Sequence, residues 1–179
     1  MNNEELLARI EKLEKDTGRL SDIDAIRCLK AEQVLAFEDK ENSVSRSIAT
    51  VTDDIVMDYG PDFGVHEGIE LFRQFAKNPP FEWAIHFMIP SRIEVVDGGE
   101  TAEAVWYLWE LATKVSPIDG NGKGFMLAGV YYDTYRKLSN GEWKICKMKL
   151  DTQLLCSYKK GWETEKIIDL SIDGWAIEL

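Results

Sequence analysis

His86 is the side chain of this sequence with the clearest capacity for chemistry, because it stands in the otherwise apolar run WAIHFMIP at residues 83–90. Such a run is typical of a buried strand. A partly desolvated imidazole beside a carboxylate can move protons near neutral pH. The alternative is a core histidine whose ring hydrogen-bonds to a backbone carbonyl group.

Strand alternation brings a second titratable group into consideration. His86 shares one strand face with Ala84 and Met88, and Glu110 shares a face of the next apolar strand with Trp106. If both faces point into one pocket, an imidazole and a carboxyl group converge among apolar side chains, where burial raises the pKa of the acid. Glu110 at an exposed strand edge is the alternative interpretation.

The elements that position these residues are expected to be helices in the first part of the sequence and strands in the second. Helical spacing predicts a helix that ends at Gly18, and a longer one that begins at Ser21 or Asp22 and carries Glu38 near its C-terminal end. Further helices are expected at 43–52 and 67–77, with a strand at 55–59 and a loop at 60–64 between them. Strands follow at 82–96, with or without a break at Pro90, and at 101–114, 124–137 and 142–153. This order predicts an α+β fold.

The length of 179 residues fits one domain. We expect an N-terminal helix at 1–18, the main domain at 19–155 and a C-terminal tail at 156–179. Apolar side chains in the tail predict that it covers the domain's own pocket or packs on a neighbouring subunit: Tyr158, Trp162, Ile167, Ile168, Ile172 and Trp175.

Charge and composition exclude several classes of partner. A net charge of −11 makes nucleic acid and anionic membranes poor partners. No run has the apolar length to span a membrane, and the N-terminus lacks a secretory signal core. Three scattered cysteines, Cys28, Cys146 and Cys156, indicate neither a disulfide framework nor a zinc site. We therefore expect a cytoplasmic protein that uses no cofactor or metal.

Local motifs occur in a specific order along the chain: DYG at 58–60, VHEGIELF at 65–72, His86-Phe87, AVWYL at 104–108, GVYYDTY at 129–135 and EWKI at 142–145. Over about residues 20–162 this order resembles the SnoaL-like branch of the nuclear transport factor 2-like superfamily. That group includes scytalone dehydratase, ketosteroid isomerase, polyketide cyclases and bile-acid 7-alpha-dehydratase. The resemblance implies a cone-shaped α+β barrel, in which a strongly curved antiparallel sheet wraps around helices and encloses a deep apolar pocket.

The resemblance also implies roles for four residues. His86 would be the acid and base, Glu38 would orient its ring, and Tyr59 would point toward the substrate oxygen. Glu110 stands where bile-acid dehydratase has an acid, so it is a candidate second acid and base. Without the resemblance, Glu38 would be interpreted as a solvated acid at a helix end. The candidates for substrate binding are Phe37, Met88, Trp106, Met126, Tyr132 and Asp133.

The chain departs from the family pattern at several positions. Position 38 is Glu where Asp is usual, and the neighbouring residue is Phe37, close to where a functional tyrosine often stands. No histidine follows His86, and Thr152 takes the place of an arginine expected from bile-acid dehydratase. A general apparatus for proton transfer is therefore expected, without the specific substrate of either enzyme.

These residues predict a cofactor-independent, dehydratase-like lyase acting on a small hydrophobic oxygenated molecule, aromatic, polyketide-like or steroid-like. Double-bond isomerisation or cyclisation is the alternative reaction, because isomerisation needs the same base and oxyanion stabiliser. A non-catalytic ligand-binding or assembly domain is the rival from another class. An apolar outer sheet face predicts a homo-oligomer, with a trimer favoured over a dimer.

Overall fold

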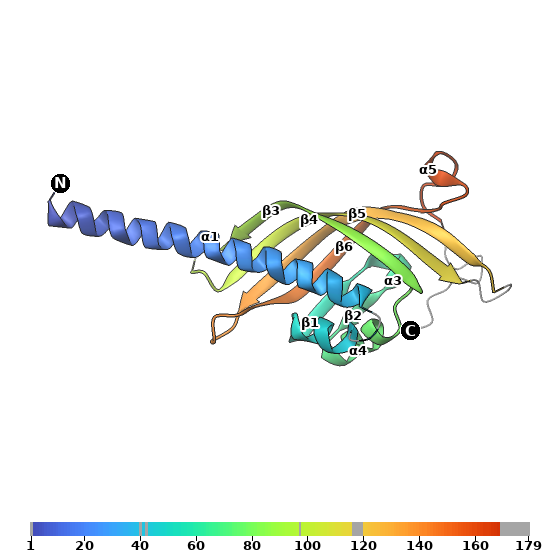
Figure 1. Ribbon diagram of the computed structural model, residues 1–179, viewed down its shortest axis with the longest axis horizontal. Coiled ribbons are helices and arrows are strands. Elements are labelled where there is room, and N and C mark those ends of the chain that lie inside the picture. The colour runs from blue at the N-terminus through green and yellow to red at the C-terminus, as the bar shows by residue number, and fades with distance from the viewer. Residues whose placement is uncertain (1, 40, 42, 97, 116–119, 169–179) are drawn as a thin grey trace.

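The computed structural model describes residues 2–39, 41, 43–96, 98–115 and 120–168. Its elements along the chain are α1 (Asn3–Glu38), α2 (Ser43–Ala49), β1 (Val51–Asp58), α3 (Gly60–Phe63), β2 (Val65–Glu67), α4 (Ile69–Lys77), β3 (Trp83–Val95), β4 (Thr101–Val115), β5 (Gly122–Lys137), β6 (Trp143–Ser157) and α5 (Gly161–Thr164) (Figure 1). Most helices precede the four long strands, so the predicted α+β class is confirmed.

The strands form one sheet in the described part of the chain, in the order β2-β1-β6-β5-β4-β3. Strands β1 and β6 run parallel, and all the other neighbours run antiparallel. The long strands curve together, and the C-terminal half of α1 lies along their concave side (Figure 1). Strands β2 and β3 are the two edges, so the curved sheet is not closed into a barrel.

The hollow of the sheet holds the hydrophobic core. Ile26 of α1 and Phe72 of α4 are fully buried there together with Ile145 and Met148 of β6. Strand alternation directs these side chains inward, while the opposite face of β3 and β4 leaves large apolar residues exposed: Trp83, Phe87, Ile89, Tyr107 and Trp109.

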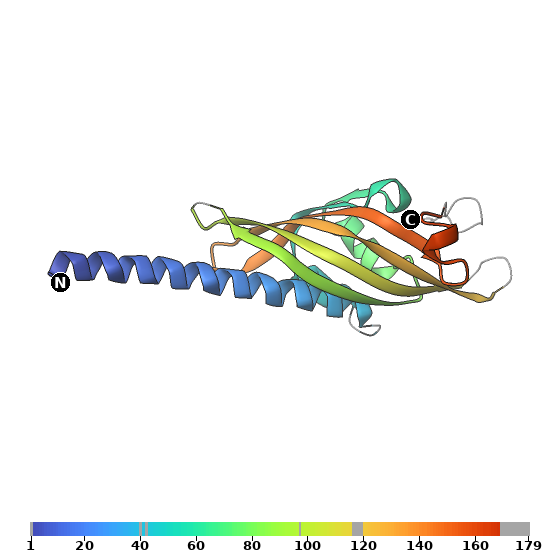
Figure 2. The ribbon, with the colours of Figure 1, turned by 90° about the horizontal axis from the view of Figure 1, so that it is seen from above.

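Helix α1 is continuous, and the prediction that one helix ends at Gly18 is wrong. Gly18 does not adopt a positive φ, and a glycine inside a helix costs only about 0.5–1 kcal/mol relative to alanine. The helix starts with a capping box, in which the Asn2 side chain accepts from the Glu5 N–H and the Glu5 carboxylate accepts from the Asn2 N–H. Residues 2–20 are all exposed, and this segment projects well beyond the sheet (Figure 2).

Several strand boundaries differ from those expected. The helix expected at 43–52 ends at Ala49, because β1 begins at Val51 and pairs with β6. The predicted loop at 60–64 contains the single turn α3, and the short strand β2 was not predicted. Strand β3 continues through Pro90 with a register shift, which an edge strand tolerates because proline lacks an N–H group.

The C-terminal tail begins later than expected, since β6 continues to Ser157 across the boundary placed at residue 155. Tyr158 and Trp162 are exposed in the structure. Ile168 packs against the core, whereas Ile172 and Trp175 lie outside the described residues. Within the part of the chain that the structure describes, no helix has the length and apolar content needed to cross a membrane.

Candidate active site

A cavity of about 630 Å³ lies between α1 and the concave side of the sheet. Its apolar lining includes Val34, Phe37, Phe75, Met88 and Leu127. Polar residues interrupt this lining: Lys30, Gln33, Glu38, Ser43, Tyr59, Lys77, Glu82, His86, Glu110 and Tyr131. A mostly apolar cavity with a few convergent polar groups is the usual form of a small-molecule site.

Glu38 and His86 meet at the edge strand β3. One carboxylate oxygen of Glu38, Oε1, accepts the backbone N–H of His86 at 2.7 Å and lies 3.2 Å from its Nδ1. The carboxylate therefore favours the tautomer in which Nδ1 carries the proton and donates it to Glu38. This leaves Nε2 as the ring nitrogen that can accept a proton.

Glu110 lies on the other side of the imidazole. His86 and Glu110 are direct cross-strand partners on β3 and β4, and Glu110 Oε2 is 3.5 Å from His86 Nε2. Glu110 is 5% exposed, so it does not stand at an exposed strand edge. Burial raises the pKa of Glu110; a charged His86 opposes this shift in pKa and the nearby Glu38 charge adds to it. The raised pKa favours the protonated form of Glu110, which can therefore act as an acid.

Tyr59 and Tyr131 bring two hydroxyl groups to the cavity lining. Tyr59 directly follows β1, and its ring meets that of Tyr131 edge to face with centroids 6.1 Å apart. Burial raises the pKa of both phenols, so both remain protonated and can donate hydrogen bonds near neutral pH. The Tyr59 hydroxyl lies 4.0 Å from Met148 Sδ, which is a weak acceptor.

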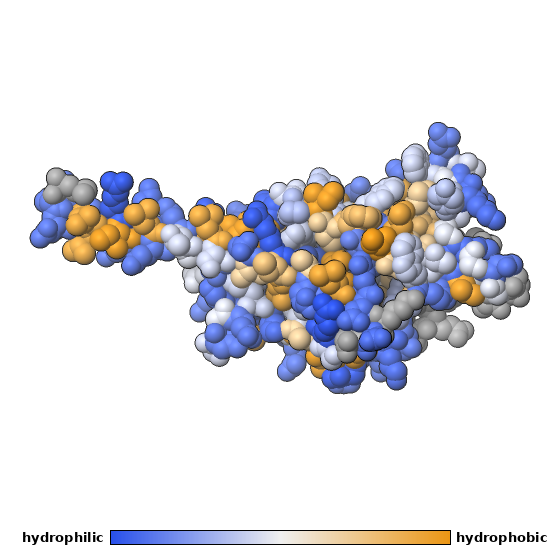
Figure 3. All heavy atoms as spheres, in the orientation of Figure 1, coloured by the Kyte–Doolittle hydropathy of each residue, from blue (hydrophilic) through white to orange (hydrophobic). Residues whose placement is uncertain are grey.

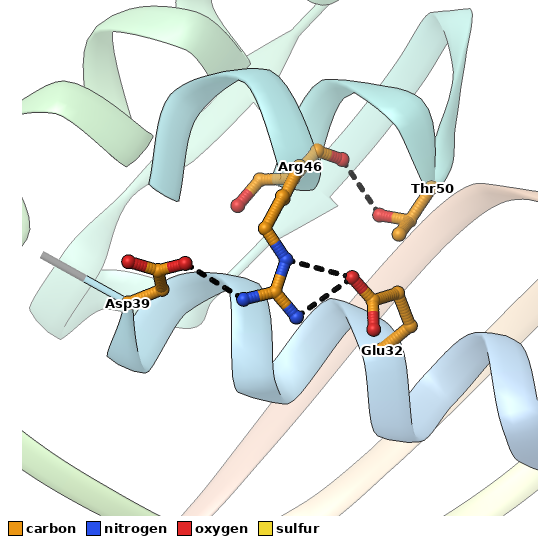
Figure 4. Close-up of polar contacts among 5 residues, drawn as sticks. Glu32, Asp39, Arg46 and Thr50 are labelled. Atoms are coloured by element: carbon orange, nitrogen blue, oxygen red, sulfur yellow. Dashed lines mark hydrogen bonds and ion pairs between the residues drawn. The ribbon is translucent and has the colours of Figure 1, made fainter. Parts of the chain in front are cut away.

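Arg46 of α2 holds the end of α1 that carries Glu38 (Figure 4). Its Nε and Nη2 contact Glu32 Oε1 at 2.8 Å, and its Nη1 donates to Asp39 Oδ2 at 2.7 Å. Acids near a helix C-terminus are unfavourable against the helix dipole, and a cation placed there offsets this effect. Arg46 thus ties together the two acids on either side of the turn that presents Glu38.

A buried ion pair lies farther along α1. Lys30 Nζ is 2.8 Å from Asp133 Oδ2 of β5, and the two side chains are 2% and 0% exposed. Asp133 Oδ2 also accepts a hydrogen bond from the Tyr135 hydroxyl at 3.1 Å, and the Tyr135 hydroxyl oxygen accepts the Trp106 indole N–H at 3.1 Å. These contacts fix Asp133 inside the core, with Lys30 between it and the cavity.

The predicted site residues fall into two groups in the structure. The cavity lining includes His86, Glu38, Tyr59, Glu110, Phe37 and Met88. It does not include Trp106 and Asp133, which form the network below the cavity floor, nor Met126 and Tyr132. The last two share the opposite face of β5 from Tyr131, because side chains alternate along a strand, and Tyr132 is 48% exposed. Placing these four residues in the pocket lining is therefore corrected.

Six polar residues of the cavity were given no role from the sequence, namely Lys30, Gln33, Ser43, Lys77, Glu82 and Tyr131. Lys30 and Gln33 stand at helical spacing from the buried Ile26, on the same face of α1. That spacing is the signal that would have placed both residues inside. The described residues contain no group of three or more His, Cys, Asp or Glu side chains arranged to hold a metal ion.

Comparisons with known proteins agree with this architecture. A family model described as a SnoaL-like domain matches residues 18–149. No curated protein matches the chain. Among solved structures, hexachlorocyclohexane dehydrochlorinase LinA type 2 has a TM-score of 0.69 at 22% identity, over 79% of this chain and 92% of that one.

Two further structures show the same fold. LinA type 3 from Novosphingobium barchaimii LL02 has a TM-score of 0.67 at 21% identity, over 79% of this chain and 93% of that one. A protein from Novosphingobium aromaticivorans DSM 12444, provisionally assigned as a scytalone dehydratase, has a TM-score of 0.64 at 20% identity, over 80% of this chain and 91% of that one.

Proposed function

The chain belongs to the SnoaL-like family, and from this membership and the polar groups of its cavity we propose that it is a cofactor-independent lyase. The proposed reaction removes water from a small hydrophobic molecule that carries a carbonyl and a hydroxyl group. Aromatic, polyketide-like and steroid-like molecules suit the apolar lining. The neighbouring structures named as a dehydrochlorinase and, provisionally, a dehydratase support an elimination.

One observation carries this proposal: a carboxylate, an imidazole and a carboxyl group follow one another at 3.2 Å and 3.5 Å along the cavity. The surrounding side chains are mostly apolar, and an apolar environment strengthens electrostatic interactions. The cavity of about 630 Å³ is also large enough for a ligand, which favours a ligand-using protein over a purely structural domain.

The proposed step gives one role to each of four side chains, His86, Tyr59, Glu110 and Glu38. His86 Nε2 takes the proton from the carbon next to the carbonyl group, and the C–H electron pair forms an enolate whose oxygen accepts a hydrogen bond from Tyr59. The enolate electrons then form the carbon–carbon double bond as the bond to the hydroxyl oxygen breaks. Glu110 supplies the proton that makes this oxygen leave as water. Glu38 orients His86 and stabilises the cation that forms on its ring.

A ketone probe tests the proton-transfer step without knowledge of the natural substrate. In D₂O, the protein is expected to exchange the protons beside the carbonyl of 1-tetralone for deuterium, as followed by NMR. A His86→Gln variant should lose about 10²-fold or more of this rate, the usual contribution of a general base. The matched control is His66→Gln, because His66 Nε2 contacts the Phe63 carbonyl at 2.8 Å outside the proposed catalytic set. Exchange that persists in His86→Gln would refute the assignment.

Mass spectrometry of incubations with β-hydroxyketones then separates the reactions. A product lighter by one water indicates the proposed dehydration. In a parallel incubation, conversion of a β,γ-unsaturated ketone into its conjugated isomer, followed by ultraviolet absorbance, indicates isomerisation, which uses the same His86 and Tyr59. Binding of ketones without exchange or product in any incubation would favour the non-catalytic alternative.

We also propose that the protein forms a homo-oligomer in the cytoplasm. The exposed apolar side chains along the projecting part of α1 support self-association: Leu6, Leu7, Ile10, Leu13 and Leu20 (Figure 3). The apolar outer face of β3 and β4 adds a second surface of this kind. Free Cys28, Cys146 and Cys156 suit a reducing compartment.

A further inference from the structure

The cavity has a second polar region, distinct from the His86 region. Lys30 and Gln33 of α1 line it, one helical turn apart. Glu38 stands eight residues after Lys30 on the same helix, which corresponds to about 12 Å along the helix axis. The two polar regions are therefore separated by the length of a small ring system.

Lys30 is buried but only partly satisfied by the contacts described above. Its ammonium group pairs with Asp133 at 2.8 Å and lies 4.4 Å from the centroid of the Tyr131 ring. An ammonium group has three N–H donors, and a single carboxylate oxygen and a ring face use at most two of them. Because Lys30 also lines the cavity, its remaining donor can reach a ligand there.

Gln33 provides the complementary group. Its side-chain oxygen Oε1 is buried, yet it accepts no hydrogen bond from any residue that the structure describes. The residue is 5% exposed and lines the cavity. A buried acceptor without a donor is costly, and a ligand that brings a donor removes this cost.

We propose that Lys30 and Gln33 bind a hydroxyl group of the substrate, at the end opposite to the carbon that loses its proton. The hydroxyl donates to Gln33 Oε1 and accepts from Lys30 Nζ. The substrate class is thus a hydroxyketone of two or more rings, with its oxygen atoms roughly 10 Å apart or less. This inference rests on the proposed function for which end reacts, whereas the hydroxyl site itself depends only on the cavity.

Three ketones of one ring system test the hydroxyl site: 1-tetralone, 6-hydroxy-1-tetralone and 6-methoxy-1-tetralone. The hydroxy compound has both donor and acceptor, the methoxy compound has an acceptor only, and the parent has neither. Isothermal titration calorimetry should show the hydroxy compound binding about tenfold more tightly than the methoxy compound, which cannot donate to Gln33 Oε1. The methoxy compound should in turn bind about tenfold more tightly than the parent, which cannot accept from Lys30 Nζ.

Two variants remove the site in different ways. Gln33→Met removes the acceptor, and Lys30→Met combined with Asp133→Asn removes the ion pair without leaving a buried charge unpaired. In Gln33→Met the hydroxy and methoxy compounds should bind with affinities within about twofold of each other, because the bond to the Gln33 acceptor is gone. In the double variant the methoxy compound and the parent should bind within about twofold of each other, because the bond from Lys30 is gone. The control is His86→Gln, which should keep the preference for the hydroxy compound although it loses proton exchange.

The outcomes separate this inference from the proposed function. The site is supported if Gln33→Met loses the preference for the hydroxy over the methoxy compound and the double variant loses the preference for the methoxy compound over the parent, whether or not the protein catalyses exchange. Exchange without any hydroxyl preference in the wild type leaves the proposed function standing and overturns the site. A hydroxy-over-methoxy preference that survives in Gln33→Met, or a methoxy-over-parent preference that survives in the double variant, also overturns it.

Discussion

Glu38 Oε1 makes contact with both the backbone N–H and the Nδ1 of His86, so a single atom fixes the position and the orientation of the imidazole. Glu110 faces the opposite ring nitrogen and is far more buried than Glu38, with 6% against 24% of the side chain exposed. Two carboxyl groups beside one imidazole thus experience different environments. The more exposed Glu38 is suited to orient the imidazole, and the more buried Glu110 is suited to carry a proton.

Glu110→Gln should separate the two halves of the proposed reaction. An amide cannot supply the proton for the leaving oxygen, so dehydration is expected to fall by about 10² or more. Deuterium exchange of a ketone needs only His86 and Tyr59 and should stay within a few-fold of the wild-type rate. Parallel measurements of exchange and dehydration provide the check, and an equal loss of both rates would contradict the assignment of Glu110 as the acid.

The raised pKa of Glu110 also predicts a pH dependence of stability. The folded protein holds this proton more tightly than the unfolded chain, in which the pKa is near 4.5. The wild type should therefore lose stability as the pH rises from that value through the raised pKa, because the buried group must ionise. Glu110→Gln lacks this loss, so its melting temperature relative to the wild type should increase with pH. A difference that is constant between pH 5 and pH 8 would argue against the raised pKa.

At the scale of elements, one helix supplies Lys30, Gln33 and Glu38 to the cavity, and the edge strand β3 supplies His86. The spacing between the polar groups of α1 is set by helical geometry. The position of the helix end relative to β3 depends instead on tertiary contacts. Arg46, with its bonds to Glu32 and Asp39, is one of those contacts.

Arg46→Met is expected to loosen the end of α1 and so to weaken the orientation of His86 by Glu38. Exchange activity should fall several-fold through kcat with little change in KM, since the cavity lining is unchanged and positioning errors mainly affect the chemical step. The control is Arg136→Met, which breaks a comparable surface pair with Asp54 at 3.0 Å and should leave kcat unchanged. Equal effects of both variants on kcat would show that Arg46 has no special positioning role.

The sequence predicted the long strands, because apolar runs bounded by turn residues are typical of strands. It grouped the side chains of β3 and β4 by face without deciding which face points inward, and the outward face of β3 carries the large apolar residues Trp83, Phe87 and Ile89. From the sequence, His86 and Glu110 converge only if both strand faces point into one pocket, and an exposed strand edge was the alternative for Glu110; the structure has the two residues as cross-strand partners.

The sequence did not predict β2, whose three residues carry too little periodicity to recognise. The burial of Lys30 was not predicted, because a charged side chain is expected at the surface unless it is paired. Its partner, Asp133, is distant in the sequence, so the pairing could not be recognised from the sequence.

Considered as a whole, the molecule has a compact part and a projecting helix. The exposed residues Leu6, Ile10, Leu13 and Leu20 recur at intervals of four, three and seven along the projecting segment. Apolar spacing of three and four residues is the pattern by which helices pair in coiled coils. An isolated exposed helix with such a stripe is marginal in water, so a partner helix is expected.

Replacement of Ile10 and Leu13 by Glu should therefore reduce the oligomeric state, because charges cannot be buried between helices without a large cost. Light scattering coupled to size-exclusion chromatography measures the molar mass of the particle. The control is replacement of Lys12 and Lys15 by Glu, on a different side of the same helix, which should leave the mass unchanged. An unchanged mass in the Ile10 and Leu13 variant would place self-association, if any, on the sheet instead.

The contact between Glu38 and the backbone of β3 has a consequence for aggregation. Strand β3 is a sheet edge, and an edge with free N–H groups is a template on which other chains can add strands. Because Glu38 occupies the His86 N–H at 2.7 Å, the carboxylate caps part of that template. A side chain one methylene shorter would have less reach from α1 to the His86 N–H, which gives a physical reason for Glu at position 38. A substitution at position 38 is therefore expected to lower the solubility of the protein as well as its turnover.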